Sequence, residues 1–143
     1  MLTEPIADPA DTTPAALRTQ YLAALTAVVE SVGAAEVAAE TELSRERVDE
    51  LASDDPGAVT LAEAAAVLSC SPDYPGADDV LLEVRDHLML EMSSAVVDVD
   101  ALKRGVDTDL DAKELQQKVE GRREMTLEEY ARVVHYLATE NPW

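Results

Sequence analysis

Apolar residues recur along this chain at intervals of three and four, and each run lies between residues that are typical of helix ends. One run would cover a single side of a long helix: Leu17, Tyr21, Leu22, Leu25, Val28, Val29 and Val32. Thr13 and Pro14 are typical of an N-cap and a first helical position, and Gly33 of a helix end. No segment alternates apolar and polar residues as a half-buried strand does. We therefore predict an all-α fold.

The order of the predicted helices repeats. Each half contains a long helix, two short helices, and a helix that opens with a capping box, a Thr followed three residues later by Glu. These boxes begin at Thr60 and Thr126, which are 66 positions apart. We predict two tandem helix-turn-helix-like units that arose by internal duplication. The boundaries are a flexible segment over 1–13, a degenerate first unit over 14–69, a linker over 70–78 and a second unit over 79–143.

Charge and composition restrict the setting of the protein. Among 143 residues, 30 are acidic and 11 basic, so the net charge is −19; Lys is scarce and Phe is absent. This composition resembles that of salt-in halophiles, because molar salt screens repulsion between surface charges. An acidic DNA mimic and an unusually acidic mesophilic protein remain alternatives. Cys70 is the single cysteine, which fits a reducing compartment. With no membrane-length apolar run and no signal pattern, we expect a cytoplasmic protein.

The second half contains a rhythm of short helix, glycine-containing turn and second short helix. It consists of three segments: Val99-Asp-Ala-Leu-Lys-Arg-Gly-Val106, Leu110-Asp-Ala-Lys-Glu-Leu-Gln-Gln-Lys-Val-Glu-Gly-Arg-Arg123 and Met125-Thr-Leu-Glu-Glu-Tyr130. This rhythm resembles the helix-turn-helix of phage-repressor (Cro/C1-type) proteins. The whole chain resembles uncharacterised acidic haloarchaeal proteins of unknown function. In the first half, Ser44, Arg45 and Arg47 would occupy the equivalent helix.

The resemblance implies a recognition helix over 111–120 that enters the major groove of DNA. Lys113, Gln116 and Gln117 would face base edges, since a Gln side chain can pair with adenine. Phosphate contacts would come from Lys118, Arg122 and Arg123, and from Arg104 on the preceding helix. Three apolar residues of the same region would lie in the core: Leu102, Leu115 and Val119.

Local charge gives evidence on both sides of the DNA-binding prediction. Residues 1–99 hold 20 acidic and 4 basic residues, whereas residues 100–143 hold 10 and 7. Six of those seven basic residues fall between 103 and 123, as a DNA-contacting face requires. Against this, residues 100–143 taken together are still net acidic. Molar salt also removes most of the counterion-release gain of DNA binding. A solvated helix face is the alternative interpretation.

The sequence offers no catalytic arrangement. It has no glycine-rich phosphate loop, no Ser/His/Asp set and no cysteine or histidine at a metal-ligand spacing. We therefore expect a non-catalytic protein without cofactor or metal. The first functional hypothesis is a DNA-binding transcriptional regulator. The alternative is a protein-interaction module, with a protein partner or a second copy as its ligand, that keeps the helical scaffold without binding DNA.

Overall fold

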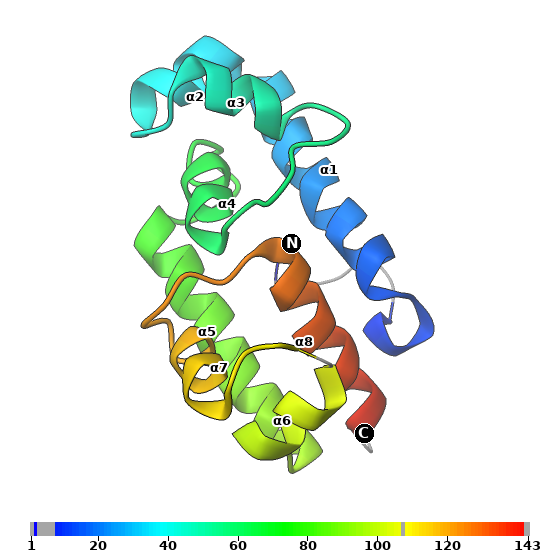
Figure 1. Cartoon of the computed structure of the whole chain (residues 1–143). Coiled ribbons are helices and arrows are strands. Elements are labelled where there is room, and N and C mark those ends of the chain that lie inside the picture. Colours follow the sequence, from blue (N-terminus) through cyan, green and yellow to red (C-terminus); the bar gives the residue numbers. More distant parts are fainter. Residues whose placement is uncertain (1, 3–7, 107, 142–143) are drawn as a thin grey trace.

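The computed structural model describes residues 2, 8–106 and 108–141, and within them the fold is all-α (Figure 1). A short 3-10 helix, η1 (Pro9–Asp11), precedes the α-helices. The α-helices are α1 (Pro14–Val32), α2 (Ala34–Glu40), α3 (Arg45–Leu51), α4 (Leu61–Leu68), α5 (Ala77–Ala95), α6 (Val99–Val106), α7 (Ala112–Val119) and α8 (Leu127–Glu140). The predicted all-helical class is confirmed.

Short-range capping contacts fix where these helices begin. The Thr13 hydroxyl accepts a hydrogen bond from the Ala16 amide at 3.1 Å, and α1 begins at the predicted proline. Both capping boxes are formed, because Thr60 and Thr126 each exchange hydrogen bonds with the glutamate three residues later. Each such cap contributes about 0.5–2 kcal/mol. The predicted helix starts are therefore correct where a cap marks them.

Helix α8 joins the two predicted halves in one core. It packs against η1, α1, α5 and α6, and Figure 1 shows it in the middle of the fold. The Tyr130 ring of α8 lies against the Tyr21 ring of α1, with centroids 5.5 Å apart. The Tyr130 hydroxyl donates to the Leu2 carbonyl at 2.8 Å. Residues from both halves thus form one hydrophobic core.

The two capping boxes also pair with each other. The Leu61 amide donates to the Met125 carbonyl at 2.8 Å, and the Leu127 amide donates to the Val59 carbonyl at 2.7 Å. The two hydrogen bonds form an antiparallel bridge between Thr60 and Thr126. Equivalent positions of the two halves therefore meet reciprocally, as in a pair related by a two-fold axis. Duplication itself stays a prediction.

Three local expectations differ from the structure. The first concerns the segment over 1–13 that was predicted to be flexible. There Leu2 is buried and η1 packs on α8, because both cover apolar surface of the core. Residues 1 and 3–7 lie outside the described part of the chain. Residues 77 and 78 of the predicted linker belong to α5, whose first turn carries the acids Asp78 and Asp79. Acids are favourable there because they complement the helix dipole.

The third difference concerns Gly105, the glycine of the turn that was predicted between the two short helices. It lies inside α6, where an added Cβ would come within 2.1 Å of the Tyr136 ring. This glycine therefore allows α6 and α8 to pack closely, in accordance with their contact.

Glu63 gives a pH-dependent prediction. Its hydrogen bonds from the Arg47 guanidinium, helped by the Thr60 amide, lower the pKa of this carboxyl. A lowered folded-state pKa means that the carboxylate stabilises the fold above its ordinary pKa of about 4.3, and that this contribution disappears as pH falls through the lowered value. We expect Glu63→Gln to lower the free energy of unfolding by about 1–3 kcal/mol at pH 7. The deficit should shrink toward pH 3.

Urea unfolding of the wild type and the variant between pH 7 and pH 3 measures this difference. Glu46→Gln, at an exposed position on α3, is the matched control and should leave the free energy of unfolding nearly unchanged. A Glu63→Gln deficit that stays constant over the whole pH range would contradict the assigned role of the carboxylate.

Candidate nucleic-acid or protein interface

The predicted recognition helix exists as α7, and its inner side is apolar. Leu115 and Val119 are buried, as is Leu102 on the neighbouring helix α6, so the predicted core residues are confirmed. Asp111 caps the helix by accepting a hydrogen bond from the Glu114 amide at 2.7 Å. Lys113 and Gln116 lie exposed on the outer side, while Gln117 is half-buried. Arg104 is exposed on α6.

Gly121 sets the direction in which the chain leaves α7. Its φ of 80° lies in the left-handed region, which glycine adopts without strain. The Gly121 amide donates to the Lys118 carbonyl at 3.2 Å, and the Arg122 amide donates to the Gln117 carbonyl at 2.8 Å. This pair of hydrogen bonds is the Schellman arrangement of a helix end. It leaves Arg122 and Arg123 exposed on the loop that leads to α8.

Lys118 holds α7 to the start of α8. Its ammonium group donates to both carboxylate oxygens of Glu129, at 2.6 and 2.8 Å. Only 16% of the Lys118 side chain is exposed. Glu129 is also the acid of the second capping box, so one carboxylate serves the helix cap and the ion pair. Lys118 therefore has a structural role that competes with a phosphate contact.

Two exposed arginines that follow α7 also have carboxylate partners. Arg122 pairs with Glu120, and Arg123 pairs with Glu114 at 3.3 Å. The Gln116 amide donates to Glu120 at 2.8 Å. The hydrogen bonds from Gln116 and Arg122 lower the pKa of the Glu120 carboxyl. Because these groups are exposed, each ion pair adds little to the stability of the fold and can exchange with a ligand.

The equivalent residues of the first half are structural. Ser44 caps α3 by accepting a hydrogen bond from the Arg47 amide at 3.0 Å. Arg45 pairs with Asp49 on the same helix at 3.2 Å. Arg47 binds Glu63 at 2.6 Å and donates to the carbonyls of Pro56 and Ala58. Arg47 thus holds the loop between α3 and α4.

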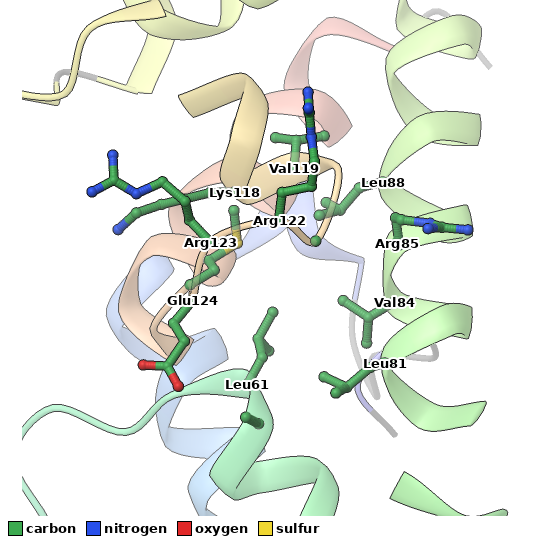
Figure 2. A pocket seen from close by; sticks show the side chains of 13 residues that line it. Leu61, Leu81, Val84, Arg85, Leu88, Lys118, Val119, Arg122, Arg123 and Glu124 are labelled. Carbon is green, nitrogen blue, oxygen red and sulfur yellow. The ribbon is translucent and has the colours of Figure 1, made fainter. Parts of the chain in front are cut away.

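A pocket that the sequence analysis did not predict lies beside the α7–α8 loop. It has a volume of about 230 Å³ and is lined by residues of α4, α5, α7 and this loop (Figure 2). Its apolar lining consists of Leu61, Leu81, Val84, Leu88, Val119 and Met125. Figure 2 shows Leu61, Leu81 and Val84 facing the gap between α5 and the loop. The apolar residues of α5 were visible in the sequence, but no nearby residue indicated that they face the α7–α8 loop.

The charged residues that line this pocket are mostly basic. They are Arg85, Lys118, Arg122 and Arg123, with Glu124 as the acid among them. The carboxylates that pair with these cations lie outside the lining residues. In a chain of net charge −19, four of the 11 basic residues therefore line one pocket. Three of the four belong to the predicted DNA-contacting set.

Among the described residues, no three His, Cys, Asp or Glu side chains are grouped as a metal site requires. Within the same residues, no single helix has the length and apolar character to cross a membrane; only α1 and α2 together do, and they are bent by 98°.

Comparison with known proteins gives a family without an assigned activity. No curated protein and no solved structure shows a significant match to this chain. The model of DUF5791, described as a family of unknown function, matches residues 17–140, which include α2 to α8 and most of α1. The chain therefore belongs to the DUF5791 family.

Proposed function

We propose that this protein is a non-catalytic protein-interaction module built on a helix-turn-helix-like scaffold, and that its binding site is the pocket between α4, α5 and the α7–α8 loop. The observation that carries the proposal is the pocket itself, which combines an apolar floor with basic residues at its edge. Such pockets bind a small number of large side chains of a partner, which then contribute most of the affinity.

DNA binding through α7 is the competing hypothesis, and the charges around α7 argue against it. Duplex DNA presents one negative charge per about 1.7 Å of its axis, so it would meet carboxylates as well as cations. Glu114 and Glu120 lie on or next to α7, and Glu124 and Glu128 follow on the loop and α8. A protein segment, by contrast, can place its charges only where the arginines lie. The acidic composition also favours a protein that functions in molar salt, where phosphate contacts add least to the affinity for DNA.

Site-specific photo-cross-linking tests the proposal. A photoreactive phenylalanine analogue replaces Arg122 at the edge of the pocket, and Arg132, exposed on α8 and outside the pocket lining, in the control protein. In extract from the source cells, we expect a discrete protein adduct from position 122 and none from position 132. The captured protein is then purified and its affinity for the wild-type chain is measured by calorimetry.

Two neighbouring leucines of α5 provide matched variants for that affinity measurement. Leu81→Glu places a charge on the pocket floor, whereas Leu82→Glu places one at a side chain that is 46% exposed. We expect Leu81→Glu to abolish binding and Leu82→Glu to preserve it, with folding of both checked by circular dichroism.

The opposing test is selection of genomic DNA fragments by the purified protein. It is carried out in about 0.2–3 M KCl, which spans strong and weak screening of charge. Enrichment of one sequence that is lost in Arg122→Ala/Arg123→Ala would overturn the proposal in favour of a DNA regulator.

A further inference from the structure

The size of the pocket restricts what it can bind. At about 230 Å³ it is smaller than the roughly 300–1,000 Å³ of sites that enclose a cofactor or a drug-sized molecule. A single large apolar side chain of a partner fits such a volume better than a whole ligand does. The lining is largely aliphatic, and Val84, Leu88, Val119 and Met125 are buried around it. Burial of an apolar side chain here is favourable because it removes apolar surface from water.

The edge of the pocket restricts the charge of the partner. Three arginines at this edge have largely exposed side chains: Arg85 is 48%, Arg122 65% and Arg123 49% exposed. They can therefore contact a ligand without any rearrangement of the core. Figure 2 shows their side chains extending in three different directions, away from the apolar residues. The aliphatic part of Arg85 lies beside Gly121, so α5 and the loop both contribute cations. The arginines thus lie around the pocket, not on one side of it.

The intramolecular ion pairs do not prevent this use. Exposed pairs such as Arg123–Glu114 contribute little to stability, so a ligand carboxylate can replace the internal one at low cost. Lys118 differs, because its ammonium group is held by the mostly buried pair with Glu129. The exchangeable cations are therefore the three arginines.

From the apolar floor and the surrounding arginines, we infer that the pocket binds a protein segment with one large apolar side chain flanked by carboxylates. This inference rests on the proposed function and specifies its partner. The apolar side chain enters the pocket, and the flanking Asp or Glu residues reach Arg85, Arg122 and Arg123. Complementary charge of this kind increases the association rate and selects the partner more than it increases affinity.

Methionine methyl groups allow a direct test. Met125 lines the pocket, whereas Met89 lies on α5 outside the lining and is 47% exposed. The probes are two short synthetic peptides, each with one central Phe, flanked by glutamates in the first and by lysines in the second. We expect the glutamate peptide to shift the 13C-methyl resonance of Met125 and to leave that of Met89 in place. The lysine peptide should shift neither.

Charge reversal distinguishes the role of the arginines. Arg122→Glu/Arg123→Glu should weaken binding of the glutamate peptide about tenfold or more, which corresponds to 1.4 kcal/mol. Arg132→Glu, an exposed charge on α8, is the matched control and should leave the affinity unchanged. All variants change exposed side chains, and circular dichroism confirms that each is folded. Equal binding of the two peptides, or an unchanged affinity in the double variant, would overturn the inference.

The outcome also separates this inference from the proposed function. If neither peptide shifts Met125 while the Arg122 position still cross-links to a purified protein partner, the inferred partner chemistry is wrong and the interaction module stands. If dodecanoate shifts Met125 and the glutamate peptide does not, the pocket binds a lipid anion and the inference is overturned. If the peptide binds as expected but no cellular protein cross-links, the pocket chemistry holds and the proposed function fails.

Discussion

Replacement of Tyr130 by Ala is expected to lower the free energy of unfolding by about 3–5 kcal/mol. The Tyr130 side chain is fully buried in the first turn of α8, and its ring packs on Tyr21 of α1. Truncation leaves a cavity between helices from the two halves of the chain. Because native proteins are stable by only about 5–15 kcal/mol, the variant loses a large part of its total stability. Urea unfolding followed by circular dichroism measures the loss.

Tyr130→Phe is the matched variant, because it keeps the ring and removes only the hydroxyl. The Leu2 carbonyl then loses its donor, at a cost of about 1–3 kcal/mol. The Phe variant should therefore lie between the wild type and the Ala variant. Should Tyr130→Ala unfold at the same urea concentration as the wild type, α8 would not join the two halves as described.

Replacement of Arg47 by Met is expected to lower the free energy of unfolding by about 2–4 kcal/mol. Its guanidinium donates to both carboxylate oxygens of Glu63, at 2.6 and 2.8 Å, and to Glu50 at 2.9 Å. It also donates to the carbonyls of Pro56 and Ala58, at 3.3 and 2.8 Å. One side chain therefore connects α3, the following loop and the cap of α4. Methionine keeps the aliphatic packing and removes every one of these hydrogen bonds.

Arg45→Met is the matched control on the same helix. Arg45 pairs with Asp49 one turn away, and both side chains are 59% exposed, so its loss should cost at most about 0.5 kcal/mol. Arg47→Lys should give an intermediate loss, because an ammonium group keeps the charge but cannot form the planar fork. Thermal unfolding of the three variants in one buffer compares them. Equal melting temperatures for Arg47→Met and Arg45→Met would contradict the role assigned to Arg47.

The sequence was sufficient for features that depend on neighbouring residues. Thr13, Thr60 and Thr126 were predicted to begin helices and do, because each cap is a hydrogen bond to an amide three residues later. The core positions Leu102, Leu115 and Val119, which the helix-turn-helix resemblance implied, are buried. The start of α5 was placed too late, although the acids Asp78 and Asp79 were a signal for an earlier one.

The candidate site was only partly predictable. The basic residues of 104–123 were identified from sequence, but their interpretation as DNA contacts stays a prediction. Whether a cation is free depends on which carboxylate lies beside it, and Lys118 meets Glu129 11 residues away along the chain. Arg47 and Glu63 are 16 residues apart. With 30 acidic residues available, spacing alone could not select these partners.

The helical class, the caps and the apolar side of each helix could be predicted, because helix formation and capping involve residues within about four positions. Three other features appear only in the folded chain: the Tyr130 hydroxyl donates to the Leu2 carbonyl, the two capping boxes pair, and α5 forms a pocket with the α7–α8 loop. These contacts join segments far apart in the chain. Hydrophobic burial, which drives them, has no direction and does not specify which apolar surfaces meet.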